Sequence, residues 1–337
     1  MTRRVIVHVG QMKSGTTFVQ QTLAHNRERL LTNGISYPGP KFNQQHACYG
    51  LCGNDVYWVH DQERWEHAGD ALLDSIRAFD GTILISSEAL SCMPRAGVDR
   101  FVERIGGIDT VVVTVRNMLS TLLSAWQQGV KRGSEASLAA FFARMQEERD
   151  AKAGLWRNYA FGSTVERWSH HADVSVVVVD SFERDEIMQV FLRAARIDGV
   201  ELTAPELSAK DRNISLRWED AELLRSINRT TNARRRPDAD EFRGFLLEHL
   251  LFPATQSGLG SRIKFPEEHI DKSVAWARDE IAEFPTGTTV LGSVDALASS
   301  TTVASTPDAD NSVDLVERTE ELLFDWFRRQ TLSSEQR

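Results

Sequence analysis

Four short runs of β-branched residues in the first half of the chain constrain its fold most. The runs are Val5–Val9, Thr82–Ser86, Thr110–Val115 and Val174–Val179. Each is almost continuously apolar rather than alternating, which is typical of parallel strands covered on both faces. Segments with helical spacing of apolar residues, such as 65–79 and 138–145, lie between them. This alternation predicts a three-layer α/β/α fold with a mainly parallel central sheet.

The second half of the chain has a mainly helical pattern. Four helices are predicted there, at 187–196, 218–228, 241–251 and 267–283. The Ser, Thr, Ala and Gly content of 286–311 predicts a mobile or partly disordered loop, and a last amphipathic helix is expected over 313–330. We expect one domain over 1–337, with a core at 4–200 and helical additions at 201–283.

The charge balance and the apolar runs exclude several classes of function. The chain of 337 residues has 39 Lys and Arg against 48 Asp and Glu, a formal net charge of −9. Nucleic-acid binding requires a broad basic surface, so no nucleic-acid partner is expected. No apolar run reaches the roughly 18 residues of a membrane helix, so no integral membrane association is expected. A first apolar run too short for a signal peptide and only three cysteines predict a cytoplasmic protein.

The most informative stretch is Gly-Gln-Met-Lys-Ser-Gly-Thr-Thr at 10–17, which follows the first predicted strand and opens a helix. In that position backbone N–H groups and a helix N-terminus form a cradle for an anion. Gly10 and Gly15 have the spacing of the glycines in a Walker A loop, G-x-x-x-x-G-K-[ST]. However, Thr16 stands where the Walker lysine should be, and the loop's lysine is Lys13. The usual lysine contact with a γ-phosphate is therefore not expected.

Lys-Ser-Gly-Thr-Thr after an N-terminal strand resembles the 5′-phosphosulfate loop of sulfotransferases that use PAPS (3′-phosphoadenosine 5′-phosphosulfate), closest to those of the bacterial and carbohydrate type. The resemblance implies a P-loop NTPase-like fold and PAPS as cofactor, with PAP (adenosine 3′,5′-bisphosphate) as product. Lys13 would stabilise charge on the leaving PAP, and no metal would be required. Contacts to the cofactor are expected along the whole loop, from Gln11, Met12, Lys13, Ser14, Gly15, Thr16 and Thr17.

A second motif begins at the end of the third predicted strand. Arg116 follows this strand directly, and Ser124 lies eight residues later on a predicted helix. This resembles the 3′-phosphate motif of the same family, a strand followed by R-x7-S. Arg116 offers a planar donor fork for the phosphate, and Ser124 could donate a hydroxyl hydrogen bond to it. The family often has proline after the arginine, where this chain has Asn117.

Sulfuryl transfer to an alcohol needs a base near the acceptor hydroxyl. Glu88, at the carboxyl end of the second predicted strand, resembles the glutamate that acts as base in carbohydrate-type sulfotransferases. His46, in a predicted loop after the first strand–helix unit, is the alternative catalytic residue. Cytosolic sulfotransferases often use a histidine, but theirs follows a later strand. We therefore favour Glu88 and keep His46 open.

The resemblance predicts a sulfotransferase that moves a sulfuryl group from PAPS to a hydroxyl of a small molecule, sugar or lipid. Two alternatives stay open. One is a P-loop kinase of a small molecule, which should need Mg²⁺ and a lysine adjacent to Gly15. The other is a non-catalytic nucleotide-binding protein whose helical half recruits a partner. The residues leave the identity of the acceptor and the oligomeric state open.

Overall fold

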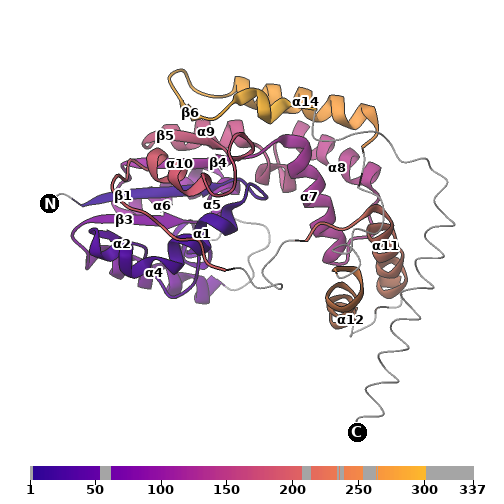
Figure 1. Ribbon diagram of the computed structural model, residues 1–337, viewed down its shortest axis with the longest axis horizontal. Coiled ribbons are helices and arrows are strands. Elements are labelled where there is room, and N and C mark those ends of the chain that lie inside the picture. Colours follow the sequence, from indigo (N-terminus) through magenta and orange to yellow (C-terminus); the bar gives the residue numbers. More distant parts are fainter. Residues whose placement is uncertain are drawn as a thin grey trace, which may run out of the picture. The chain divides into compact units, whose positions relative to one another are not determined.

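The computed structural model describes residues 3–53, 62–206, 214–233, 235, 239–252, 263 and 265–300. Its centre is a six-stranded sheet in the order β2-β3-β1-β4-β5-β6, in which every pairing is parallel. Helices cover both faces of this sheet (Figure 1). This architecture confirms the predicted α/β class. The strands are β1 (Arg4–Gly10), β2 (Ile35–Ser36), β3 (Thr82–Ser86), β4 (Thr110–Val115), β5 (Asp173–Val178) and β6 (Thr289–Leu291).

The four long strands match the four predicted runs, whereas the two edge strands were not expected. β2 has two residues and β6 has three, too few to show a β-branched run. β6 lies inside 286–311, so the prediction of a loop there is wrong at Thr289–Leu291 and at the 3-10 helix η5 (Val294–Ala298). Pairing with β5 orders this stretch, which local composition does not reveal. The rest of that segment from 301 onward and the predicted helix at 313–330 lie outside the described residues.

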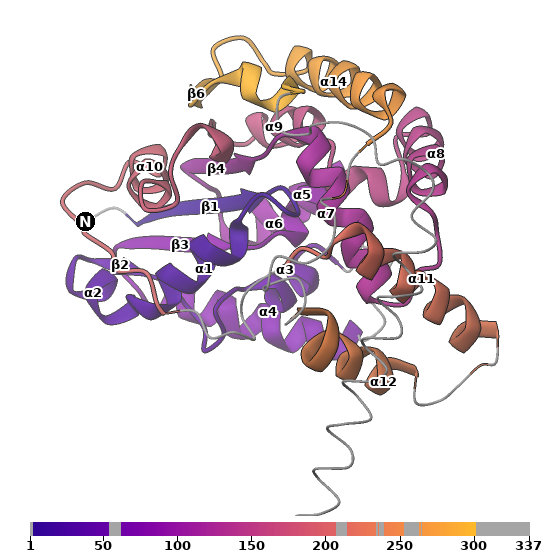
Figure 2. The same cartoon turned by 45° about the vertical axis from the view of Figure 1, so that its right-hand side comes forward.

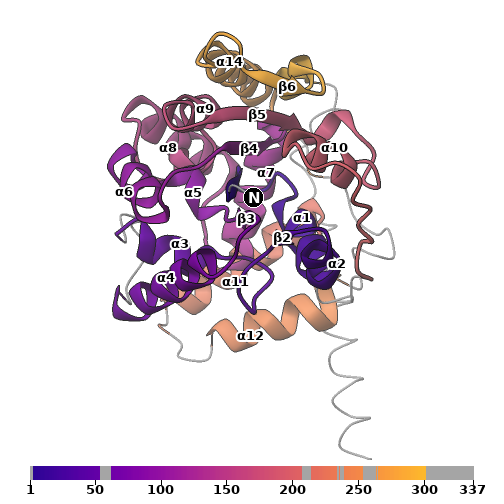
Figure 3. The same cartoon turned by 90° about the vertical axis from the view of Figure 1, so that its left-hand side faces the viewer.

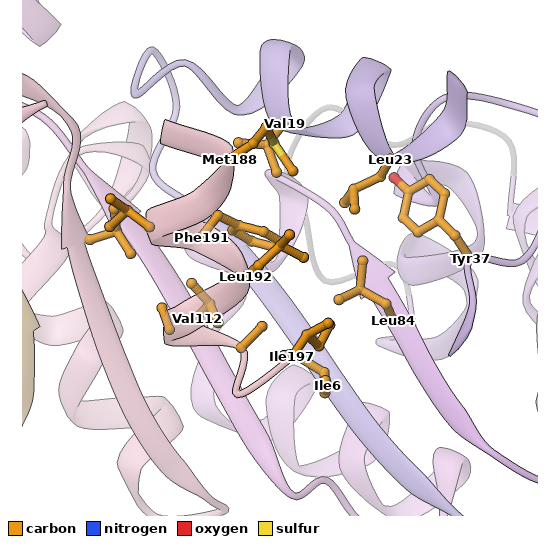
Figure 4. Packing of buried hydrophobic residues seen from close by; sticks show 14 of the residues in the cluster. Ile6, Val19, Leu23, Tyr37, Leu84, Val112, Met188, Phe191, Leu192 and Ile197 are labelled. Carbon is orange, nitrogen blue, oxygen red and sulfur yellow. The ribbon is translucent and has the colours of Figure 1, made fainter. Parts of the chain in front are cut away.

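One face of the sheet is covered by α1 (Thr16–His25), α2 (Arg27–Thr32) and α10 (Ile187–Ala194) (Figure 3). Figure 4 shows the apolar cluster that joins them to the strands. Ile6 of β1 and Val112 of β4 belong to this cluster, together with Phe191 of α10 and Val19 of α1. Burying this apolar area fixes α1 on the sheet and thereby fixes the loop that precedes α1.

The other face carries α5 (Ala89–Cys92), α6 (Arg95–Ile105) and α9 (Phe161–Ser169), with α3 (Gln45–Leu51) and α4 (Gln62–Arg77) packed against each other beside them (Figure 3). The rings of Phe101 and Trp168 meet edge to face at 5.9 Å. Trp168 Nε1 also donates to the Leu90 carbonyl at 3.3 Å. These contacts tie α9 to α6 and α5, and so position the segments that follow β3.

The chain divides into two compact units. The first, at 1–121, 145–206 and 272–299, holds the sheet, and the second occupies 122–144, 207–271 and 300–337. The second unit contains α11 (Trp218–Ala233), α12 (Ala239–Leu246) and a π-helical turn, η4 (Leu247–Leu251), of which α11 and α12 are labelled in Figure 2. Helices α7 (Met118–Lys131), α8 (Leu138–Asp150) and α14 (Glu267–Ala282) contribute residues to both units. The single domain over 1–337 stays a prediction.

The second unit has a buried interior of its own. Asn228 on α11 donates its side-chain amide to the carbonyls of Val130 and Ser134 at 2.8 and 2.9 Å. Trp126 stacks on Trp218 with ring centroids 6.2 Å apart. In the ranges that the structure describes, no helix has both the length and the apolar character needed to cross a bilayer.

Candidate functional site

The loop between β1 and α1 lies at the carboxyl edge of the sheet, where ligands of parallel α/β proteins bind. A Cβ on Gly10 would stand 1.8 Å from Cγ2 of Thr16, so only glycine lets α1 begin this close to the strand. Gly15 has φ +78 and precedes the first residue of α1. The N-cap residue, Gly15, has no side chain to cap this helix, and the Phe18 N–H donates to the Gly15 carbonyl at 3.0 Å. An anion would therefore meet the N–H groups that precede Phe18.

Lys13 adopts a left-handed backbone conformation, with φ 71. Such a conformation costs a non-glycine residue about 1–3 kcal/mol and concentrates at functional sites. The side chains of Met12 and Lys13 are half-buried, and Thr17 is exposed on the first turn of α1. These three predicted ligands therefore lie on the outer side of the loop.

Gln11 is buried and holds the loop in place. Its backbone N–H donates to the Thr114 carbonyl at 2.9 Å. Its side chain donates to the Tyr159 carbonyl at 2.8 Å and accepts from the Arg116 backbone N–H at 3.1 Å. The Gln11 side chain thus braces the loop against β4 and against the turn before α9.

Ser14 and Thr16 are also buried, in different ways. Ser14 Oγ donates to the Gln11 carbonyl at 2.7 Å and lies 3.0 Å from Thr114 Oγ1. Thr16 Oγ1 is buried and has no hydrogen-bond partner among the described residues. Because unsatisfied buried hydroxyls are uncommon, Thr16 is a group that an anion on the loop could satisfy.

A buried histidine behind the loop was not singled out in the sequence. His8 Nδ1 lies 2.7 Å from Ser86 Oγ, and its Nε2 lies 3.1 Å from Thr114 Oγ1. Thr114 in turn contacts Ser14 of the loop. This hydrogen-bonded row crosses β3, β1 and β4 and ends at the loop. Polar residues inside otherwise apolar strand runs are the signal that could have revealed it.

Burial lowers the pKa of His8 to about 3, so the ring is neutral in the folded protein at neutral pH. The unfolded chain binds this proton more readily, so His8 reduces stability as the pH falls below its ordinary pKa of 6.5. We expect His8→Gln to remove up to about 1.4 kcal/mol per pH unit from the acid-side slope of the unfolding free energy. Urea unfolding of the wild type and of the variant between pH 4 and pH 6.5 measures this slope of the unfolding free energy. His25→Gln, on an exposed residue of α1, is the control, and equal slopes for the two variants would contradict the prediction.

Glu88 lies two residues beyond β3, directly before α5. The preceding residue, Ser87, donates its N–H to the His8 carbonyl at 3.1 Å, which ties this segment to β1. Because β1 and β3 are parallel neighbours, Glu88 and the loop at 10–17 leave the sheet at the same edge. Glu88 itself is half-buried.

His46 lies in the first turn of α3, so the expectation of a loop there is wrong. Gln44, the residue before α3, anchors the start of the helix. Its N–H donates to the Ser86 carbonyl at 3.2 Å, and its side chain accepts from the Ser86 N–H at 2.8 Å. This anchor fixes the start of α3 beside the end of β3. The His46 ring lies 4.0 Å from that of Trp65, and its Nδ1 lies 3.1 Å from Lys41 Nζ. Burial, and then the nearby cations, lower the pKa of His46.

Arg116 follows β4 at the same edge. Its Nε pairs with Asp180 Oδ1 at 3.4 Å, and its side chain is 37% exposed. A partly exposed pair of this length contributes little stability, so the guanidinium can turn to a phosphate at low cost.

Asn117, which replaces the family's proline, donates its N–H to Asp180 Oδ2 at 2.6 Å, a bond that proline cannot make. Its side chain donates to the carbonyls of Ala296 and Ser299 at 2.8 and 2.9 Å.

Ser124, the second residue of the predicted 3′-phosphate motif, is half-buried on α7 and belongs to the second unit. Arg116 belongs to the first unit. Their joint use as phosphate ligands stays a prediction. In the described ranges, no cluster of three or more His, Cys, Asp or Glu side chains is arranged to hold a metal ion.

No family model matches this chain, and no curated protein sequence matches it. One similar solved structure is that of retinol dehydratase in complex with androsterone and inactive cofactor PAP. The two chains are 15% identical, the alignment covers 82% of this chain and 80% of that chain, and the TM-score is 0.37. A likeness at this level says nothing of the function of this chain.

Proposed function

We propose that this protein is a sulfotransferase that moves a sulfuryl group from PAPS to a hydroxyl of a small molecule, sugar or lipid. The observation that carries the proposal is the loop between β1 and α1. Its lysine lies inside the loop in a left-handed conformation, and a threonine occupies the position of the Walker lysine. That arrangement resembles a 5′-phosphosulfate loop rather than a nucleoside triphosphate loop.

The residues at this edge suit the two charged ends of PAPS, which would supply the sulfuryl group. Backbone N–H groups at 15–17 and the Thr17 hydroxyl would hold the 5′-phosphate, in line with the N-terminus of α1, whose N-cap Gly15 has no side chain. The buried hydroxyl of Thr16 would gain an acceptor. Arg116, with Ser124 as its predicted companion, would hold the 3′-phosphate.

Two side chains take chemical roles in the proposal. Glu88 accepts the proton of the acceptor hydroxyl while that oxygen bonds to sulfur. Lys13 neutralises the negative charge that develops on the phosphate oxygen as its bond to sulfur breaks. His46 is the second candidate for the base, because it also lies beside the end of β3.

PAP should protect the fold against heat. A ligand at about 100 times its Kd stabilises the folded state by about 2.7 kcal/mol, which appears as a rise in Tm. Differential scanning fluorimetry with PAP measures the effect. Adenosine 5′-phosphate, which lacks the 3′-phosphate contacted by Arg116, is the control and should protect less.

The same experiment separates the proposal from a kinase. If ATP with Mg²⁺ raises Tm and PAP does not, the proposal is wrong and the result favours the P-loop kinase alternative. Transfer of radiolabelled sulfate from PAPS to a mixed set of hydroxyl acceptors then tests the reaction itself. PAP binding without transfer to any acceptor supports the non-catalytic alternative.

A further inference from the structure

A cavity of about 350 Å³ lies within the first unit, and the proposed function does not use it. Its walls come from the end of α8, from η1 (Gly154–Asn158), from α9 and from the C-terminal end of α14. Figure 2 shows α9 and α14 next to one another. Four cationic side chains line the cavity, namely Arg149, Lys152, Arg157 and Arg167.

The three arginines are held in place by the protein. Arg167 Nη2 donates to the Ser91 carbonyl at 2.7 Å, and its buried Nε has no hydrogen-bond partner in the described part of the chain. Arg157 Nε donates to the Lys152 carbonyl at 3.2 Å. Arg149 pairs with Asp279 at 2.5 Å. These fixed donors make the cavity a preorganised anion site rather than a flexible charged surface.

Three carboxylates line the cavity, and one of them, Glu280, is partly protonated near neutral pH. Glu280 is 6% exposed and accepts the Gly162 N–H at 2.7 Å. Burial and then the neighbouring Glu283 raise the pKa of Glu280 to about 7. Near neutral pH a large share of Glu280 is therefore uncharged. Because Arg149 is paired with Asp279, this leaves Asp150 and Glu283 against the three cations Lys152, Arg157 and Arg167. The cavity has excess positive charge.

The position of the cavity ties it to the candidate site. Ala160 in its wall follows Tyr159, whose carbonyl accepts the side chain of Gln11 in the loop. Arg167 in its wall binds the carbonyl of Ser91, which lies on α5 directly after Glu88. Its walls are thus joined both to the loop and to the segment that carries the proposed base.

We infer that this cavity binds the anionic group of a small organic acid, with Arg157 and Arg167 as its main partners and Trp156 as an apolar wall. Arginine forks suit carboxylates in geometry and in charge. The next step rests on the proposed function. If the protein is a sulfotransferase, this acid is the acceptor, and its anionic group lies in the cavity.

Benzoate binding in the presence of saturating PAP tests the inference, because PAP then occupies the loop. Isothermal titration should detect benzoate and not the neutral analogue benzamide. Arg157→Gln should weaken benzoate binding about tenfold or more, which corresponds to the loss of one charge-assisted hydrogen bond. The matched control is Arg77→Gln, because Arg77 is an exposed arginine at the end of α4 and does not line the cavity. Because Arg167 also holds α5, Lys152→Gln is the second variant.

The pH dependence gives an independent readout. The charged groups around Glu280 are Asp279 and Glu283 on its own segment, Arg149 (paired with Asp279) and Asp150 from α8, Lys152 and Arg157 at η1, and Arg167 from α9. As the pH falls through about 7, Glu280 takes up a proton and benzoate should bind more tightly. Glu280→Gln should remove this dependence.

The outcomes separate the anion site, the acceptor role and the proposed function from one another. The inference is overturned if benzoate, acetate and succinate all fail to bind, or if benzoate binding is unchanged in Arg157→Gln and Lys152→Gln. If benzoate binds but 4-hydroxybenzoate is sulfated no better than 4-hydroxybenzamide, the acceptor role is overturned. If PAP fails to bind while benzoate binds, the proposed sulfotransferase function fails and the anion site stands.

Discussion

Lys13→Ala is expected to lower turnover about 10²–10³-fold, the effect of removing one donor aimed at charge that develops in a transition state. PAP affinity should fall much less, because in the proposed function backbone N–H groups of the loop and of α1 would hold most of the phosphate. The fold should be preserved, since Lys13 lies on the half-buried outer side of the loop. Single-turnover transfer of labelled sulfate, together with PAP titration, measures the two effects separately.

Lys272→Ala is the matched control for Lys13, because Lys272 is an exposed lysine on α14 in the same unit. It should keep wild-type turnover. Turnover of Lys13→Ala equal to that of this control would contradict the role of Lys13 as the group that neutralises the leaving phosphate.

Glu88→Gln is expected to lower turnover about 10²–10⁴-fold, the contribution typical of a positioned general base. Glutamine keeps the size of the side chain and loses the basic oxygen, so binding of PAP and the stability of α5 should be unchanged. The measurement is the rate of transfer at saturating PAPS, with the PAP Kd measured in parallel.

Glu103→Gln, on an exposed glutamate of α6, is the control for Glu88. If Glu88→Gln keeps full turnover, Glu88 is not the base, and His46→Gln becomes the decisive variant. Loss of PAP binding together with turnover in Glu88→Gln would instead show that Glu88 supports the cofactor rather than the proton transfer.

Local sequence determined the main strands, the loop between β1 and α1, and the candidate residues within that loop. A buried parallel strand needs a continuous run of β-branched residues, so β1, β3, β4 and β5 are visible in the sequence. The two glycines and the displaced Lys13 lie within eight residues of one another, so no knowledge of the fold is needed to read them. The short edge strands have too few residues to leave such a pattern.

Tertiary structure alone decided which loop side chains turn inward and which distant residues meet. Gln11 and Ser14 look like ligands in the sequence, but hydrogen bonds to Tyr159 and Thr114 use their side chains inside the protein. The cavity joins a charged cluster at 149–167 to Glu280, more than one hundred residues away along the chain. The physical reason is that hydrogen bonds and charge pairs depend on distance in space, whereas a sequence pattern reports only spacing along the backbone.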